Sequence, residues 1–118
     1  MRETSRDRGR LEHMLAAIDI LLEKAVEIPR EEIQADALRY YGIVKNIEII
    51  GEAAYMLTSE FKSSNSETEW SKIAGMRHFL VHDYYNIDPD EIWQVLHYDL
   101  TPLHAQVKSY LQNMSGMQ

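Results

Sequence analysis

Apolar residues recur at steps of three and four along most of the chain, which is the period of an α-helix with one buried face. The first such row predicts a helix that begins at a Thr4 or Ser5 cap and ends before Pro29. Its apolar positions are Leu11, Met14, Leu15, Ile18, Leu21, Leu22 and Ala25. No strand-like alternation persists for more than a few residues. The pattern therefore predicts an all-α protein.

A second and longer helix is expected over roughly residues 31–61, because a single apolar row continues through that range. This row consists of Ile43, Ile47, Ile50, Ala54, Leu57 and Phe61. The polar residues 62–68 that follow, rich in serine, predict a loop. A third helix is expected over about residues 69–82, with Trp70 as a core anchor.

The last helix is expected to begin at a strong start signal. Asp88 is a suitable cap, Pro89 suits the first turn, and Glu91 completes a capping box. Further along this helix, Pro102 lacks a backbone donor and is expected to kink or break it. Together these elements predict one domain over residues 1–118, a compact antiparallel bundle of four to five helices.

The second helix carries a mixed face opposite its apolar row. This face consists of Tyr41, Lys45, Glu48, Ile49, Glu52 and Met56. Two interpretations remain open. Another helix of the same chain could cover this face, or it could form a subunit interface, where aromatic residues and methionine are enriched. In the second case Glu52 would be a supporting residue near the interface, able to orient an imidazole or pair with an arginine, although a solvated glutamate is the ordinary expectation.

Composition limits the classes of function. The chain has 118 residues, 45% of them hydrophobic, and no cysteine, so disulfides and thiolate chemistry are excluded. The charged segment 1–10 does not resemble a signal peptide and no apolar run is long enough to span a membrane, so we expect a cytoplasmic protein. The net charge of −7 argues against tight non-specific binding of nucleic acid over the whole surface.

Candidate chemistry concentrates in one short segment, in which Arg77, His78, His82 and Tyr84 stand within otherwise largely apolar sequence. An arginine offers a rigid fork of donors suited to phosphate, and histidine can transfer protons near neutral pH. A solvated cation is not expected at Arg77, where the neighbouring pattern is apolar. The alternative is a helix end whose arginine and histidine bond local carbonyls.

Helical geometry sets a condition on this segment. In an unbroken helix Arg77 and Tyr84 would lie about 20° apart, but His82 would be rotated about 140° from Arg77. The three side chains can converge only if the helix ends near His82 or if a second copy of the segment completes the site. His78 and His82 also have the i, i+4 spacing of metal ligands, but no third ligand is evident, so no metal is expected.

The spacing Arg77-x4-His82-x-Tyr84 resembles that of the HepT proteins of the HEPN superfamily. Other parts of the chain also look like the family pattern: Ile50-Gly51-Glu52-Ala53, Trp70 with Ile73 and Met76, Ile92-Trp93, Asp99-Leu100, Pro102-Leu103, and the opening Arg6-Asp7 with Leu11 and Met14. The resemblance extends over nearly the full length. One departure is His78, which stands where the family most often has asparagine, and we expect it to support the site.

This resemblance implies a HEPN-like helical homodimer whose two motifs face a shared cleft. It implies the toxin of a HepT/MntA toxin–antitoxin pair, an RNA endonuclease that needs neither metal nor other cofactor. Arg77 and His82 would be catalytic, and Tyr84 would contact the substrate. The implied partner is a small MNT-type nucleotidyltransferase that silences the toxin by attaching AMP to Tyr84.

A competing interpretation is a helical binding subunit without catalysis. Such a chain would serve as a scaffold for a minimal nucleotidyltransferase, and Arg77 and His82 would bind a nucleotide or the backbone. Substitution of His82 separates the two, because a scaffold should tolerate it.

Overall fold

Helix α1 (Arg2–Lys24) packs along two later helices, α2 (Ala37–Met56) and α7 (Leu100–Gly116), which come from opposite halves of the chain. The computed structural model describes residues 2–78 and 87–116, and no strand occurs in that part of the chain. The remaining elements are η1 (Arg30–Glu32), α3 (Ser59–Ser64), α4 (Trp70–Ala74), η2 (Gly75–Arg77), α6 (Pro89–Gln94) and η4 (Val95–Asp99). The predicted all-α fold is confirmed.

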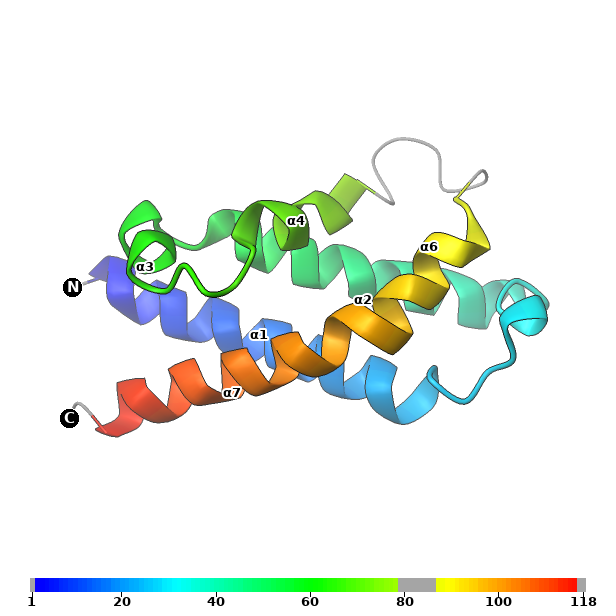
Figure 1. Cartoon of the computed structure of the whole chain (residues 1–118), viewed down its shortest axis with the longest axis horizontal. Coiled ribbons are helices and arrows are strands. Elements are labelled where there is room, and N and C mark those ends of the chain that lie inside the picture. The colour runs from blue at the N-terminus through cyan, green and yellow to red at the C-terminus, as the bar shows by residue number, and fades with distance from the viewer. Residues whose placement is uncertain (1, 79–86, 117–118) are drawn as a thin grey trace.

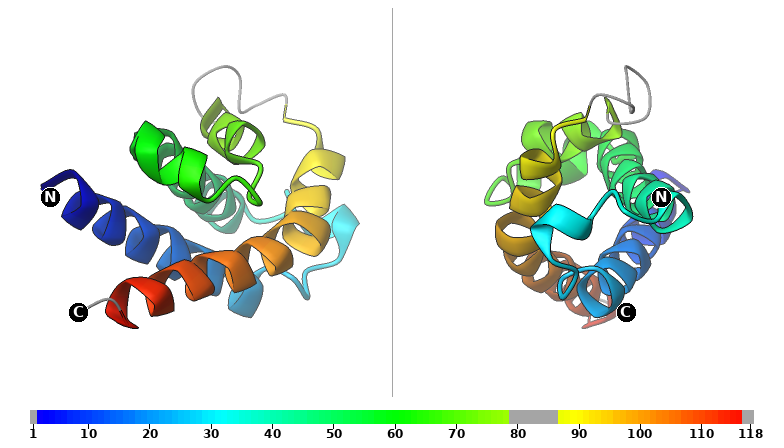
Figure 2. Two further views of the ribbon diagram at one scale, coloured as in Figure 1. Left: turned by 60° about the vertical axis from the view of Figure 1, so that its left-hand side comes forward. Right: turned by 90° about the vertical axis from the view of Figure 1, so that its right-hand side faces the viewer.

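Helices α2 and α7 both run antiparallel to α1, and the three long helices form an elongated bundle (Figure 1). α1 runs in one direction, α2 returns beside it, and the α6–α7 stretch returns along α1 after the short α3 and α4 segments. Seen end-on, the helices surround a common interior (Figure 2). The beginning of α1 and the end of α7 lie at the same end of the bundle (Figure 1).

The predicted apolar rows form the core. The α2 residues Ile43, Ile47, Ile50 and Ala54 are at most 3% exposed, and Leu57 just beyond the helix is equally buried. On α1 the same holds for Leu11, Met14, Ile18 and Leu21, with Leu15 and Leu22 packed at the margin, and Ala25 just beyond the helix is also buried. Helical periodicity alone therefore identified the buried side of both helices.

The predicted boundaries of the second helix are wrong. Instead of one helix over residues 31–61, the chain forms η1, then α2, then the separate helix α3. Each new helix begins at a polar cap: the Asp36 side chain accepts from the Arg39 amide, and the Thr58 side chain accepts from the Phe61 amide. Leu57 has an extended backbone between α2 and α3, so the apolar row continues through a corner of the chain.

The start of α1 also differs from the prediction. The helix already begins at Arg2, so Thr4 and Ser5 lie within it and do not cap it. The buried side chain of Asp7 instead reaches the corner between α2 and α3, where its two carboxylate oxygens accept from the Thr58 amide at 2.9 Å and the Thr58 hydroxyl at 2.7 Å. This contact ties α1 to the C-terminal end of α2.

The predicted cap and first-turn proline of the last helix are confirmed, because the Asp88 side chain accepts from the Asp90 amide and Pro89 opens α6. The Glu91 amide bonds to the Asp88 carbonyl oxygen and not to its side chain, as a capping box would require. Pro102 does not break this helix. The π-helical segment η4 lies just before it, and the Leu100 amide bonds to the Val95 carbonyl, five residues back. The longer π-type ring adjusts the helix next to the proline, which cannot donate a bond of its own.

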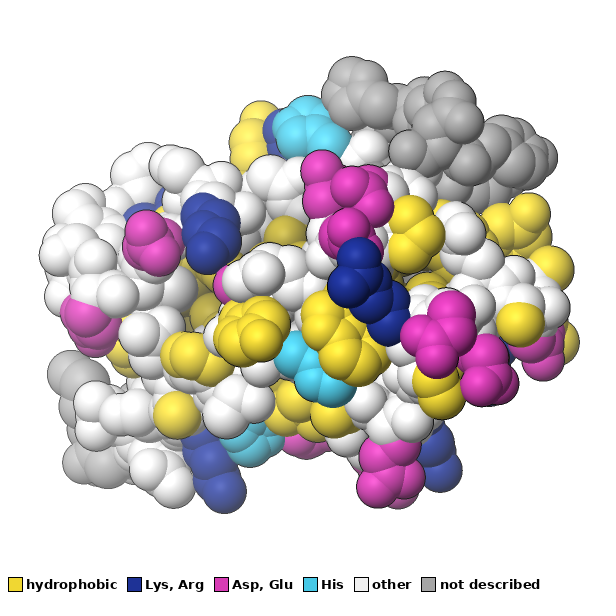
Figure 3. All heavy atoms as spheres, turned by 45° about the vertical axis from the view of Figure 1, so that its right-hand side comes forward, with side chains coloured by type: hydrophobic (Ala, Val, Ile, Leu, Met, Phe, Trp, Pro, Cys, Tyr) yellow, Lys and Arg dark blue, Asp and Glu magenta, His cyan; other side chains and the backbone are white. Residues whose placement is uncertain are grey.

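Charged groups of both signs are mixed over the face of the molecule drawn in Figure 3, where they alternate with apolar and histidine side chains. Such mixing agrees with a net charge that is moderate and not concentrated in one block. Among the described residues, no helix is both long and apolar enough to cross a membrane.

Candidate active site

The backbone of Arg77 is seated against helix α2. The α-helix α4 ends at Ala74 and tightens into the 3₁₀ segment η2, whose last residue is Arg77. A Cβ atom added to Gly51 would lie 2.3 Å from the Arg77 nitrogen, a distance that real Cβ atoms do not reach. The chain can approach α2 this closely only because Gly51 has no side chain. The segment that leads to Arg77 is therefore not one straight α-helix, because it changes from α-helix to 3₁₀-helix after Ala74.

The side chain of Arg77 is held by an aromatic ring of α2. Its guanidinium carbon lies 3.5 Å from the ring centroid of Tyr55, and the arginine is half-buried. Tyr55 follows Gly51 by four residues, so both lie on one face of α2. A cation over an aromatic ring is stabilised by the ring quadrupole. The sequence prediction that Arg77 is not an ordinary solvated cation agrees with this geometry.

Of the other predicted site residues, the structure describes His78 and Glu52 but not His82 and Tyr84. His78 is exposed at the end of η2, next to Arg77. Glu52 is exposed on α2 and, within the described part of the chain, its carboxylate takes part in no hydrogen bond or ion pair. His82 and Tyr84 lie outside the described residues, so the convergence of the motif stays a prediction. The described residues contain no cluster of three metal-ligating side chains.

The mixed face of α2 is not covered by another helix of the described chain. Four of its six residues are exposed: Tyr41, Lys45, Glu52 and Met56. Glu48 and Ile49 are half-buried at its margin. Of the two interpretations left open by the sequence, the described part of the chain gives no support to coverage by another helix, and it leaves an exposed face with aromatic and methionine side chains.

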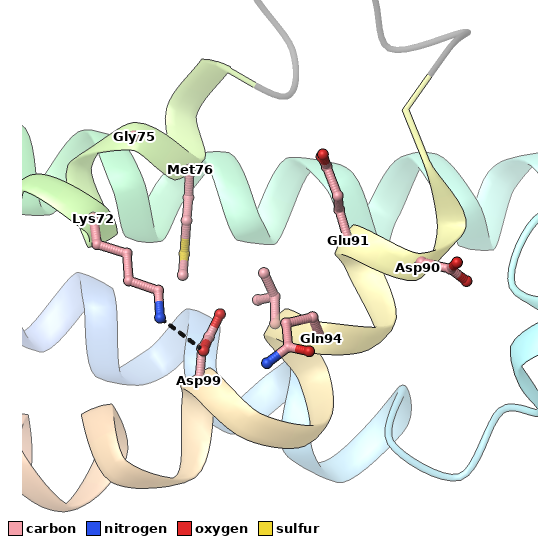
Figure 4. A pocket seen from close by; sticks show the side chains of 8 residues that line it. Lys72, Gly75, Met76, Asp90, Glu91, Gln94 and Asp99 are labelled. Carbon is pink, nitrogen blue, oxygen red and sulfur yellow. Dashed lines mark hydrogen bonds and ion pairs between the residues drawn. The ribbon is translucent and has the colours of Figure 1, made fainter.

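A cavity of about 400 Å³ lies between η2 and the α6–η4 stretch (Figure 4). Lys72 and Asp99 point toward each other across one side of it, with the ammonium nitrogen 3.3 Å from a carboxylate oxygen. Met76, the residue before Arg77, extends into the same space. This cavity therefore adjoins the segment that carries the motif arginine.

An aromatic cluster supports the start of α4. The rings of Phe61, Trp70 and Tyr110 lie with centroids 5.5–5.9 Å apart. The buried Thr68 hydroxyl hydrogen-bonds with the Tyr110 hydroxyl and donates to Gln106 at 2.8 Å. Burial raises the pKa of Tyr110 above its ordinary value, although the bond with Thr68 acts in the opposite direction. Trp70 is thus the core anchor that the sequence predicted.

Two histidines of the α6–α7 stretch, His97 and His104, take part in local contacts. The His97 ring stacks on Trp93 with centroids 3.7 Å apart, and the His104 Nε2 atom lies 2.8 Å from an Asp19 carboxylate oxygen. Trp93 is half-buried at the edge of the core.

Two residues of the site escape sequence reasoning. The sequence gives Gly51 only as part of the family-like stretch Ile50-Gly51-Glu52-Ala53, without a role, and nothing in the pattern distinguishes Tyr55. A glycine in the interior of a helix is costly, which is a signal that something packs closely there. The contact between Tyr55 and Arg77 joins residues that are far apart in the sequence, and no local sequence pattern predicts it.

Comparison with known proteins identifies the family. The family model described as Ribonuclease HepT-like matches residues 14–110, so the chain belongs to the HepT-like family. The chain is 36% identical over 105 residues to a protein of Caldanaerobacter subterraneus subsp. tengcongensis named as a candidate RNase, covering 89% of this chain and 94% of that one. The resemblance recognised from the motif is confirmed.

A second relative, from Thermococcus cleftensis and named as a candidate ribonuclease HepT, is 31% identical over 96 residues, covering 81% of this chain and 87% of the relative. A candidate RNase of Methanocaldococcus jannaschii is 24% identical over 95 residues, covering 80% and 87%. No solved structure gives a significant match to the chain.

Proposed function

We propose that this protein is a ribonuclease that cleaves RNA without a metal ion, with Arg77 and His82 as its catalytic residues. The observation that carries the proposal is the position of Arg77 within a HepT-like chain. Its backbone is seated on Gly51 and its guanidinium lies over Tyr55, and this fixed position supports a role for Arg77 in holding a phosphate. The names of the relatives agree with an RNase.

The proposed mechanism divides the work between two side chains. Cleavage requires removal of the proton from the 2′-hydroxyl, protonation of the leaving 5′-oxygen, and stabilisation of the charge on the phosphorane. Arg77 stabilises the non-bridging oxygens as that charge builds up. His82 transfers a proton. Because one imidazole cannot be base and acid at the same instant, the second proton carrier is His78 or the His82 of a second copy.

A homodimer would supply that second copy. The exposed face of α2, with Tyr41, Glu52 and Met56, is the surface we propose for the interface, because it is exposed and mixes aromatic, methionine and charged side chains. In this arrangement Glu52 would support the site from the interface. Helix α2 would then hold Arg77 on one face and contact the other subunit through the adjacent face.

The proposed biological role is that of a toxin in a HepT/MntA-type pair. The partner would be an MNT-type nucleotidyltransferase that attaches AMP to Tyr84. An AMP group adds bulk and negative charge, so it would block a phosphate-binding site by both steric exclusion and repulsion.

The net charge of −7 favours a second candidate function, a non-catalytic scaffold for the nucleotidyltransferase. In that case Arg77 and His82 bind without cleaving. The two candidates differ in their response to substitution of His82.

The deciding experiment is cleavage of total RNA in EDTA by the wild type and by His82→Ala. Intact mass should be measured first, because AMP carried over from expression would mask activity. His13→Ala, which removes an exposed histidine from α1, is the matched control. Cleavage by the wild type and the control but not by His82→Ala, leaving 2′,3′-cyclic phosphate ends, supports the ribonuclease. Equal activity of all three proteins removes His82 from the active site, and inactivity of all three favours the scaffold.

A further inference from the structure

A second cavity, of about 470 Å³, opens where the end of α2 meets α3 and α4. Its lining includes one lysine, Lys62, and three serines, Ser59, Ser63 and Ser71. None of the described residues that line it is acidic. In a chain of net charge −7, a polar cavity with a lysine and no carboxylate has the local charge that suits an anionic ligand.

This cavity adjoins the motif arginine through Tyr55. Tyr55 lines the cavity and also carries the Arg77 guanidinium 3.5 Å from the centre of its ring. Tyr55 remains 51% exposed despite that contact. Ala74, three residues before Arg77, lines the cavity as well. A ligand in the cavity would therefore lie next to whatever Arg77 binds.

The position of Lys62 is set by local structure. The residue is half-buried, and its ammonium nitrogen lies 3.4 Å from the Tyr55 carbonyl oxygen. One long hydrogen bond leaves the charge of the ammonium uncompensated, and an ammonium has further donors for a phosphate oxygen. Serine hydroxyls both donate and accept, as contact with a ribose 2′-hydroxyl requires.

We propose that this cavity, which we call the Lys62 subsite, binds the RNA strand adjacent to the phosphate held by Arg77. Lys62 contacts a backbone phosphate, the hydroxyl of Ser71 contacts ribose, and the exposed part of the Tyr55 ring packs against a base. A combination of cation, hydroxyl and aromatic ring is characteristic of single-stranded RNA sites. The inference rests on the proposed ribonuclease function and adds to it a substrate class, single-stranded RNA extending beyond the scissile bond.

The test measures binding, so that it does not depend on cleavage. Fluorescein-labelled RNA of two and of six nucleotides, of mixed sequence, is titrated in EDTA by fluorescence anisotropy. The parent protein is full-length His82→Ala, which should leave the RNA intact. Lys62→Gln is compared with Lys62→Arg, which keeps the charge, and with Lys108→Gln, which removes an exposed lysine of α7.

Lys62→Gln is expected to weaken hexamer binding roughly 3- to 10-fold and to reduce the slope of log K against log salt by about 0.7, the value for one phosphate contact on a single strand. Binding of the dinucleotide should not change. Lys62→Arg and Lys108→Gln should behave like the parent. Ser71→Ala should lower the preference for the RNA hexamer over the DNA hexamer of the same sequence.

The Lys62 subsite is overturned if Lys62→Gln binds the hexamer as tightly as the parent, if it weakens both probes equally, or if the parent does not bind the hexamer. It is also overturned if Lys62→Gln loses binding of a polyglutamate peptide but not of RNA, which would assign the cavity to an acidic protein segment. Hexamer binding that depends on Lys62, combined with no cleavage by the wild type, would refute the ribonuclease and keep the subsite as an RNA-binding site.

Discussion

Gly51 and Arg77 are in such close contact that the arginine backbone occupies the place where any other residue would have its Cβ atom. The Arg77 nitrogen lies 2.3 Å from that position, and the neighbouring atoms of Met76 and Arg77 lie within 3.0 Å. Because these are backbone atoms, they cannot rotate away as a flexible side chain can. The position of the motif arginine is therefore coupled directly to the identity of one residue on α2.

Gly51→Ala is the first test of this coupling. The added methyl group must push η2 away from α2, and we expect a loss of roughly 1–3 kcal/mol of folding stability from overpacking. RNA cleavage should fall by about 100-fold, because a displacement of about 1 Å at a catalytic group has that order of effect. Urea unfolding and cleavage kinetics measure the two effects separately.

Gly42→Ala is the matched control, since Gly42 also lies within α2 but an added Cβ atom there meets nothing within 4 Å. This variant should gain roughly 0.5–1 kcal/mol from the lower flexibility of the unfolded chain and keep its activity. Equal loss of activity in both variants would show that the effect is not specific to the contact with Arg77.

Tyr55→Leu tests the contact between the ring and the guanidinium. The leucine keeps apolar bulk but has no ring quadrupole, so the arginine loses about 0.5–1 kcal/mol of stabilisation at this partly exposed site. We expect kcat/KM for RNA to fall about 2- to 5-fold, and Tyr55→Phe to lose less, because it keeps the ring. A larger loss for the phenylalanine than for the leucine would assign the role to the hydroxyl instead.

Tyr84→Phe tests the proposed modification. Phenylalanine has no hydroxyl to accept AMP, so incubation with ATP and an MNT-type nucleotidyltransferase should leave the mass of this variant unchanged. Tyr85→Phe, one position beyond the motif, should still gain the mass of AMP. If Tyr84→Phe is modified as fully as the wild type, the assignment of the modified tyrosine is wrong.

The hydroxyl of Tyr110 gives the fold a predictable dependence on alkaline pH. Burial raises the pKa of this tyrosine in the folded state, so folding favours its protonated form. The associated stability is complete below the unfolded tyrosine pKa of about 10 and is lost as the pH rises through the folded pKa.

Urea midpoints measured between pH 8 and pH 11 should therefore fall more steeply for the wild type than for Tyr110→Phe. The phenylalanine variant should also be less stable by about 1 kcal/mol at neutral pH, because it loses the hydrogen bond with Thr68. Tyr98→Phe, at a residue that is 62% exposed, should follow the wild type across the whole range.

The sequence predicts the buried faces of the helices well, because the residues of a buried helical face are apolar and recur at steps of three and four. The spacing of Ile43, Ile47 and Ile50 alone predicts that they belong to the core, and all three are buried. The same reasoning fails where the chain turns without glycine or proline. Asp36 and Thr58 are both ordinary cap residues. The apolar row continues past Thr58 to Phe61 and hides the end of α2 there.

For the candidate site, the sequence reveals the motif but not its support. Arg77 is identifiable because its chemistry is exceptional within an apolar stretch and because its spacing to His82 carries the resemblance to the HepT proteins. Gly51 and Tyr55 hold that arginine through contacts between α2 and η2, which depend on how two segments pack in space. Such contacts leave no mark on the spacing of residues along one chain.

The arrangement around α2 has a consequence for how this protein can change over time. Its core row, the side with Gly51 and Tyr55, and the exposed face with Tyr41 and Met56 occupy successive sectors of a single helix. A mutational scan should therefore find that α2 tolerates fewer substitutions than α7, because most positions on α2 face either the core, the arginine or the proposed second subunit. Because α2 makes contacts on most of its faces, few of its positions can change without effect. Substitutions that alter substrate preference should therefore be found mainly in other parts of the chain.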